Sequence, residues 1–408
     1  MAASPEDRKL ADIRLFPIAG IRLGTAAAAI KQVGRDDVLL IEMAEGSACA
    51  AVFTRNAFCA APVSLAREHL RQAPRWLLVN SGNANAGTGA RGLADARASC
   101  EAVAALVGGP AERVMPFSTG VIGEYLPLDK IRAALPKAYE TLSEEGWDKA
   151  ARAIMTTDTR PKKATRRIDI EGYPIFVSGI AKGAGMIHPD MATMLAFVAT
   201  DARIGAGLLQ SVLEQAVNRS FNCITVDGDT STNDACVLMA SQRSEASPIE
   251  PGSAHLRAFQ SAVDAVLEEL AEAIVRDGEG ATKFIRILVE EAASEDEARL
   301  VGKTIAHSPL VKTAFFASDP NWGRILAAVG RAGCKDLDIS RVAIWLDEVR
   351  IVAGGGRDSD YTEARGVAVM QRPEITVRVS LGRGQASARI MTCDLSFDYV
   401  RINAEYRT

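Results

Sequence analysis

The chain has 408 residues, of which 48% are hydrophobic and 24% charged, the usage of an ordinary globular protein. Its net charge of −4 provides no basic field for nucleic acid, and no apolar run approaches the ~18 residues of a membrane span. The length predicts two domains.

In chain order, strand-like apolar runs alternate with helix-like stretches. The predicted strands are residues 38–43, 50–54, 76–79, 175–177, 194–199, 223–226, 284–289, 342–352 and 375–381. The predicted helices are residues 93–107, 208–218, 256–275 and 321–331. This mixed order favours a layered α/β architecture over a sandwich of sheets alone or a helical bundle.

The cysteines and the first residues of the chain indicate its cellular compartment, and the histidines indicate whether it binds a metal. The seven cysteines are odd in number and lack CxxC spacing, so free thiols in a reducing compartment are expected. The opening MAASPEDRKLADIRLF is acidic where a signal peptide is apolar, so we expect a cytoplasmic protein. The four histidines form no HxxxH, HExxH or Cys/His cluster, and we expect no metal site.

Residues 182–201, KGAGMIHPDMATMLAFVATD, place a glycine-rich loop before Ala192 and Thr193, and a buried strand after them. If the Ala192–Thr193 bond breaks, Thr193 gains an α-amine beside its hydroxyl. Such an amine has a pKa of about 7.7–8.0 and can serve as the general base of its own hydroxyl. By spacing alone, a threonine here is more often a plain strand residue. The pattern therefore allows a self-cleaving N-terminal nucleophile without requiring one.

Nine segments along nearly the whole chain resemble one family. They are VFTRNAFCAAPV (52–63), LLVNSGNANAGTG (77–89), PFSTGVIGEYLP (116–127), IMTTDTRPK (154–162), KGAGMIHPDMATMLAF (182–197), FNCITVDGDTSTND (221–234), DGEGATKF (277–284), SDPNWGRILAAVGRAG (318–333) and the terminal YVRINAEYRT. In this order they resemble the bifunctional ornithine acetyltransferase / amino-acid N-acetyltransferase (glutamate N-acetyltransferase) family of arginine biosynthesis.

The resemblance implies a fold and an activity. Residues 1–280 would form an α-β-β-α-type sandwich of the self-processing N-terminal-nucleophile kind, and residues 281–408 a C-terminal α/β domain. Cleavage after Ala192 would give an α chain (1–192) and a β chain (193–408), assembled as a heterotetramer of two of each. The enzyme would move acetyl from N2-acetylornithine to glutamate through acetyl-Thr193, without a cofactor. We also expect acetyl-CoA as a co-substrate, because nothing near the active-site motifs departs from the family pattern.

The resemblance also assigns site residues. It implies that Thr119 and Gly120 in STGVIG form the oxyanion hole, where a hydroxyl and a backbone N–H can stabilise a tetrahedral intermediate. By itself, Ser-Thr-Gly is a common turn. A lysine ammonium can pair with an amino-acid carboxylate, and a glutamate with the cationic side chain of ornithine. The implied substrate-binding residues are Thr159, Lys182, Thr193, Glu279, Asn403 and Thr408.

Four other features of the sequence give no catalytic or cofactor-binding residue. The acidic loop 227–234 fails as a calcium loop, because positions 6 and 12 are Thr232 and Leu238, so we interpret it as part of the active-site wall. GTGARG (87–92) does not open a helix directly from the preceding strand, which argues against a dinucleotide site. Many family members have a cysteine where Gly87 stands, and its absence here argues against a catalytic role for a thiol at this position. His188 is interpreted as a loop residue rather than a base.

Two rival functions stay open at this stage. One is a related N-terminal-nucleophile amidohydrolase or aminopeptidase, which would release its acyl group to water. The other is a relative that binds amino acids and never cleaves itself. The intact Ala-Thr pair, the STG motif and Lys182 argue against the second.

Overall fold

The computed structural model describes residues 13–188 and 194–405. The chain forms two compact units, and two short segments of the second interrupt the first in sequence. Unit 1 comprises Met1–Gly183, Pro189–Asn222 and Thr230–Ile274, and unit 2 comprises Ala184–His188, Cys223–Asp229 and Val275–Thr408.

Unit 1 contains two sheets. The first is four-stranded, in the order β1 (Ile21–Ala26), β2 (Val38–Met43), β4 (Trp76–Asn83), β5 (Val114–Val121). The second is five-stranded, in the order β3 (Ala48–Phe53), β9 (Ala235–Ala240), β8 (Leu195–Thr200), β7 (Tyr173–Lys182), β6 (Lys162–Ile170). All six residues of β2, β8 and β9 are buried, which explains why these strands are continuous apolar runs without alternation.

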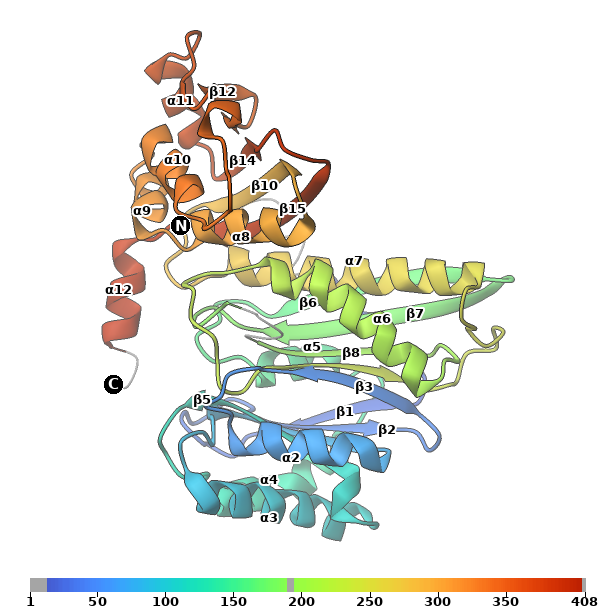
Figure 1. The fold of residues 1–408 in the computed structure, drawn as a ribbon. Coiled ribbons are helices and arrows are strands. Elements are labelled where there is room, and N and C mark those ends of the chain that lie inside the picture. Colours follow the sequence, from blue (N-terminus) through green and yellow to red (C-terminus); the bar gives the residue numbers. More distant parts are fainter. Residues whose placement is uncertain (1–12, 189–193, 406–408) are drawn as a thin grey trace. The chain divides into compact units, whose positions relative to one another are not determined.

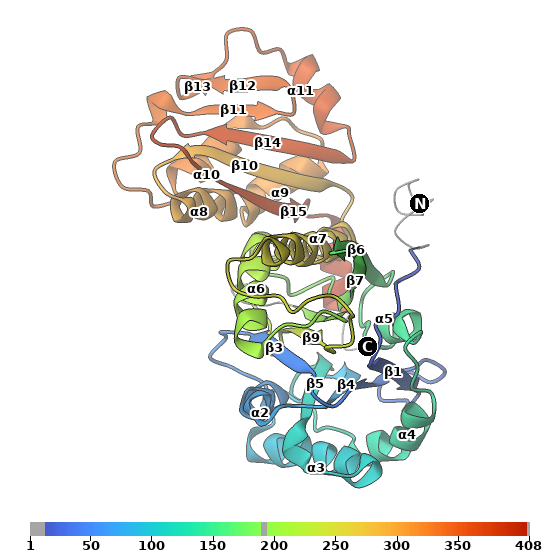
Figure 2. The ribbon, with the colours of Figure 1, turned by 90° about the vertical axis from the view of Figure 1, so that its right-hand side faces the viewer.

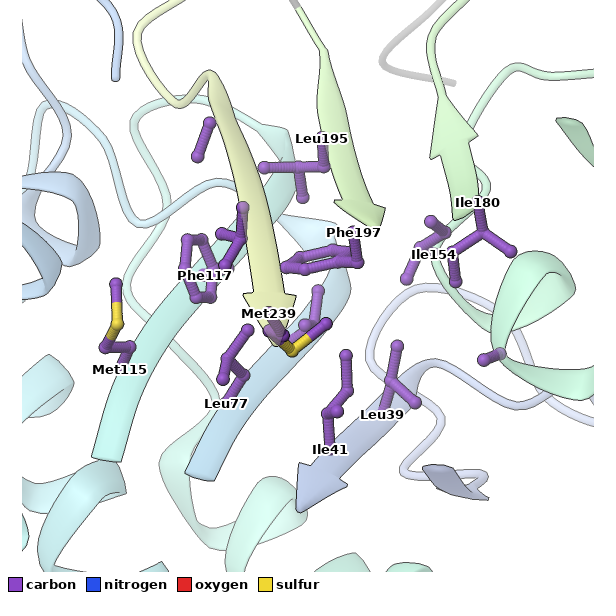
Figure 3. Packing of buried hydrophobic residues seen from close by; sticks show 14 of the residues in the cluster. Leu39, Ile41, Leu77, Met115, Phe117, Ile154, Ile180, Leu195, Phe197 and Met239 are labelled. Carbon is purple, nitrogen blue, oxygen red and sulfur yellow. The ribbon is translucent and has the colours of Figure 1, made fainter. Parts of the chain in front are cut away.

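The two sheets face each other across a common hydrophobic core. Figure 3 shows Leu39, Ile41, Leu77 and Phe117 of the first sheet packing toward Ile180, Leu195, Phe197 and Met239 of the second. The rings of Phe117 and Phe197 meet edge to face with centroids 5.2 Å apart. This packing fixes the strand ends of one sheet against those of the other.

Helices cover the outer faces of both sheets (Figure 1). α3 (Gly89–Val107) and α4 (Leu128–Glu140) pack on the first sheet, burying Cys100, Val103 and Leu135 against it. α6 (Ala206–Arg219) and α7 (Ala254–Arg276) cover the second, where Val266 and Leu270 approach Gly179 of β7. The other α-helices among the described residues of this unit are α2 (Ala61–His69) and α5 (Trp147–Ala153). Unit 1 is therefore the expected α-β-β-α layering.

Unit 2 is a six-stranded mixed sheet with helices packed on it (Figure 2). Its strand order is β13 (Gly356–Arg357), β12 (Val349–Ala353), β11 (Ala343–Leu346), β14 (Glu374–Ser380), β10 (Phe284–Ala292), β15 (Ala386–Cys393). Its helices are α8 (Glu295–Ala306), α9 (Pro309–Phe316), α10 (Trp322–Gly330), α11 (Glu363–Met370) and α12 (Phe397–Ala404). Along β14 every second residue is buried, as in a strand with one face on a core.

Two predicted strands are wrong. Residues 223–226 follow a 3-10 turn (Phe221–Cys223) and form no ladder, because their backbone bonds diverge: Thr225 N–H donates to Met391 and Val226 N–H to Ile187. Residues 342–352 form two antiparallel strands, β11 and β12, instead of one. The chain reverses at Asp347, which adopts φ +48° although no glycine, proline or asparagine marks the turn. Among the described residues, no helix is long and apolar enough to cross a membrane.

Candidate active site

One edge of the five-stranded sheet gathers strand ends from distant parts of the chain. β7 is antiparallel to β6 and β8, whereas β8 and β9 are parallel, so β7 ends where the other three begin. In register, Lys182 lies opposite Leu195, and Leu195 lies opposite Ala235. Lys182 is thus at the end of the sheet where β8 starts. The first residue of β8, Leu195, comes two residues after Thr193 in sequence. Ala192 and Thr193 themselves lie outside the described residues.

Asp158 anchors this edge. Its carboxylate accepts hydrogen bonds from Lys162 Nζ and, at 2.7 Å, from the Gly183 N–H that follows β7. The side chains of Asp158 and Lys162 are both fully buried. Burial raises the pKa of Asp158, but the ammonium groups of Lys162 and Lys182 and the Gly183 N–H outweigh it and hold that pKa below its usual range. A permanent buried anion therefore fixes the start of the glycine-rich loop. Thr159, the next residue, is exposed before β6.

A second buried carboxyl, Asp234, immediately precedes β9. Burial raises its pKa well above the usual value, against a hydrogen bond from Ser231 and the charge of Lys182, which both lower it. Its Oδ2 has no hydrogen-bond partner in the part of the chain that the structure describes. Lys182, which is 9% exposed, lowers the pKa of both buried carboxyls, and yet the pKa of Asp158 ends below its usual range and that of Asp234 above it.

Thr119 and Gly120 lie at the end of β5, where the ladder with β4 is irregular. The register shifts at Gly82 and Asn83, and Gly120 adopts φ +135°, a conformation that side-chain-bearing residues avoid. A Cβ at Gly120 would lie 2.2 Å from the Gly82 carbonyl carbon, so the two backbones can approach this closely only because residue 120 is a glycine. Thr119 is 8% exposed. The Thr119 hydroxyl and the Gly120 N–H thus belong to the last residues of β5, where β5 approaches β4 closely.

Amide side chains around the end of β5 form a network that our sequence reasoning missed. Ser118 Oγ donates to Asn80 Oδ1 at 2.6 Å. Asn80 Nδ2 donates to the Asn83 carbonyl at 2.8 Å. From the other sheet, Asn233 Nδ2 donates to the Ser118 carbonyl at 2.9 Å. The density of amides in NSGNAN (80–85) was the available sequence signal, but it does not say which strand they hold.

In unit 2, the structure brings together Glu279 and Asn403, which the sequence only implied separately. Asn403 Nδ2 donates to Glu279 Oε2 at 2.8 Å, and the Glu279 N–H donates to the Ala184 carbonyl at 2.9 Å. Gly185 packs on the carboxylate, since a Cβ there would lie 2.3 Å from Glu279 Oε2. Glu279 is 8% exposed. Thr408 lies outside the described residues.

The acidic loop has a positioning role in the same unit. Asp227 accepts hydrogen bonds from the N–H groups of Met186, at 2.6 Å, and Ile187, at 2.9 Å, and from Tyr399 Oη at 3.2 Å. His188 packs edge to face on His307, with ring centroids 4.3 Å apart. Burial, with the neighbouring His188, lowers the pKa of His307 to about 3, so this imidazole is neutral at physiological pH. The loop before the proposed cleavage point is therefore tied down at residues 184–188.

No group of three His, Cys, Asp or Glu side chains among the described residues could hold a metal ion. The cysteines are free thiols. Burial raises the pKa of Cys49 and of Cys100 to about 12, so neither is a thiolate at neutral pH.

Comparison with known proteins gives consistent matches. The ArgJ family model matches residues 22–408. The arginine biosynthesis bifunctional protein ArgJ of Methylococcus capsulatus is 91% identical over 408 residues, 100% of both chains. The protein of the same name from Pseudomonas fluorescens is 55% identical over 97% of this chain and 98% of that one. A crystal structure of Bacillus halodurans arginine biosynthesis bifunctional protein ArgJ is 41% identical with a TM-score of 0.50, covering 52% of this chain and 99% of the solved one.

Proposed function

Because this chain belongs to the ArgJ family, we propose that it transfers acetyl from N2-acetylornithine to glutamate through an acetyl ester of Thr193. The chain is an enzyme of arginine biosynthesis. The observation that carries the proposed chemistry is the common sheet edge, where Lys182 ends β7 opposite the first residue of β8. An N-terminal Thr193 would begin the strand that starts there.

The proposed processing step frees the nucleophile. Thr193 Oγ attacks the Ala192 carbonyl, the acyl group shifts from nitrogen to oxygen, and water hydrolyses the ester to leave chains 1–192 and 193–408. Two features support the step: Asp158 holds Gly183, and Asp227 holds the N–H groups of Met186 and Ile187, so the loop is fixed upstream of the bond.

In the proposed turnover, the α-amine of Thr193 accepts the hydroxyl proton as Oγ attacks the acetyl carbonyl. Thr119 and Gly120 stabilise the oxyanion, and each such donor is worth about 2.7–4 kcal/mol of transition-state stabilisation. Collapse of the intermediate expels ornithine, whose departing amine takes the proton. The glutamate α-amine then attacks acetyl-Thr193 and leaves as N-acetylglutamate. No metal or cofactor takes part.

Charged side chains bind the amino-acid groups. Lys182 pairs with a substrate carboxylate, and Glu279, oriented by Asn403, binds the cationic end of ornithine. Thr159 and Thr408 complete the proposed set. Acetyl-CoA serves as a second donor for N-acetylglutamate synthesis. We place the enzyme in the cytoplasm as a heterotetramer of two α and two β chains.

The test is transfer of a deuterated acetyl group from N2-acetylornithine to glutamate, followed by mass spectrometry. Labelled N-acetylglutamate, without labelled acetate, is expected; labelled acetate alone would instead indicate a hydrolase. Thr193→Ala should abolish transfer, whereas Thr193→Ser, which keeps the hydroxyl and the terminal amine, should retain part of it. Replacing acetylornithine by acetyl-CoA tests the second donor.

A further inference from the structure

Asn233 joins the two sheets of unit 1 at the end of β5. Its side chain is 5% exposed, and its Nδ2 donates to the carbonyls of Ala84, at 2.6 Å, and Ser118, at 2.9 Å. Its Oδ1 accepts from Thr232 Oγ1 at 2.5 Å. A carboxamide has two donor hydrogens, and both are used here, one on a carbonyl of β5 and one on the carbonyl of the residue that follows β4.

One of these carbonyls precedes Thr119 and Gly120 in β5, and the other follows β4, the strand paired with them. The Ser118 carbonyl belongs to the same peptide group as the Thr119 N–H, so a bond to it fixes the plane of that group. The Ala84 carbonyl comes directly after the register shift at Gly82 and Asn83, and the Ala84 N–H donates to the Val121 carbonyl at 2.9 Å. Residues 119–121 are thus held from both sides.

The loop that carries Asn233 is anchored without its side chain. The Thr232 carbonyl accepts from the Ala60 N–H, and the Asp234 carbonyl from the Thr54 N–H, both at 3.0 Å. Asn56 Nδ2 donates to the Thr230 carbonyl at 2.9 Å. Loss of the Asn233 carboxamide should therefore release the end of β5 and leave the loop in place.

We propose that Asn233 is a positioning residue for acetyl transfer, which holds the Ala84 and Ser118 carbonyls so that Thr119 and Gly120 aim at the oxyanion. The inference rests on the proposed function of these two residues. Asn233 touches no reacting atom. It acts through the peptide groups that it fixes. In sequence it directly precedes Asp234, at the end of the sheet where β8 and β9 both begin.

The kinetic test compares Asn233→Ala and Asn233→Asp with Asn56→Ala. This control, in the segment after β3, removes one side-chain hydrogen bond to the loop of Asn233 and none to β5, while the backbone bonds of Thr232 and Asp234 still anchor that loop. A displacement of about 1 Å near the reacting groups can lower rates ~100-fold. We expect kcat per cleaved chain to fall roughly 10- to 100-fold in both Asn233 variants with KM nearly unchanged, and Asn56→Ala to match wild type. Wild-type kcat in both Asn233 variants would overturn the proposal.

A second readout needs no cleavage. In a Thr193→Ala background, amide hydrogen exchange should accelerate in a peptide spanning 114–123 when Asn233 becomes Ala, with no change in a peptide spanning 235–240. Unchanged exchange across 114–123 would overturn the positioning role. Absence of acetyl transfer in the wild type would instead remove the proposed function, and the exchange result would stand by itself.

Discussion

Gly120→Ala, compared with Gly123→Ala, isolates the steric cost of the close strand approach at the end of β5. Both glycines have positive φ, +135° and +87°. They differ in the room for a side chain. A Cβ at Gly120 would lie 2.2 Å from the Gly82 carbonyl carbon, whereas no atom lies within 4 Å of a Cβ built at Gly123. The gain from a stiffer unfolded chain, about 0.4–1 kcal/mol, is the same in both and cancels.

The expected magnitudes follow from these differences. A left-handed residue costs about 1–2 kcal/mol, so Gly123→Ala should lower the free energy of unfolding by about 1 kcal/mol. Gly120→Ala carries a similar strain plus a clash with backbone, which adds about 1–3 kcal/mol because the strands must separate. It should also lower kcat about 100-fold, since the oxyanion donors move with the strand.

Urea unfolding in the single-chain Thr193→Ala background measures the stabilities, and acetyl transfer by each variant with Thr193 intact measures kcat. Equal destabilisation by the two substitutions would contradict the reasoning, because it would mean that the Gly82–Gly120 approach relaxes freely. Unchanged kcat in Gly120→Ala would separately show that this approach does not place the oxyanion donors.

Three further predictions follow from the charged and glycine positions. Asp158→Asn should destabilise the chain by about 3–5 kcal/mol in urea unfolding, because it removes the carboxylate that pairs with the buried Lys162 ammonium. Lys162→Met in the same chain should restore part of the loss. A loss under ~1 kcal/mol would contradict a permanent buried pair. The pKa of Asp234 is raised in the folded state, so the folded chain holds this proton at pH values where the unfolded chain has lost it. The free energy of unfolding of the wild type should therefore fall, relative to that of Asp234→Asn, as pH rises above about 4. Parallel pH profiles of urea unfolding for the two proteins would refute this. Gly185→Ala should displace the Glu279 carboxylate, because a Cβ at residue 185 would overlap it. We expect KM for acetylornithine to rise roughly 10-fold and kcat to stay similar. An unchanged KM would count against Glu279 as the ornithine ligand.

Strands buried on both faces could be predicted from sequence, because their apolar runs need no partner to be recognised. β2 and β8 are such strands, and the long amphipathic α7 was equally clear from its period. The hairpin of β11 and β12 could not be found, because its turn depends on the φ of Asp347 and not on a turn-forming glycine. Residues 223–226 look like a strand locally, but their hydrogen bonds go to residues far away in the chain.

Residues of the candidate site could be predicted only where they belong to a motif shared with the family. Thr119, Gly120 and Lys182 came from the family resemblance, and the structure supplies the reason for Gly120 in its approach to Gly82. The role of Asn233 is invisible to periodicity, because its partner Ser118 is 115 positions away. Composition alone equally cannot show that burial raises the pKa of the Asp234 carboxyl.

The central claim is that Thr193 becomes a terminal nucleophile, and intact-protein mass with N-terminal sequencing tests it most directly. We expect two fragments from the purified wild-type chain, the second beginning Thr193-Met194-Leu195, and one uncut 408-residue chain from Thr193→Ala. A folded wild-type protein that remains a single 408-residue chain would contradict the terminal-amine mechanism.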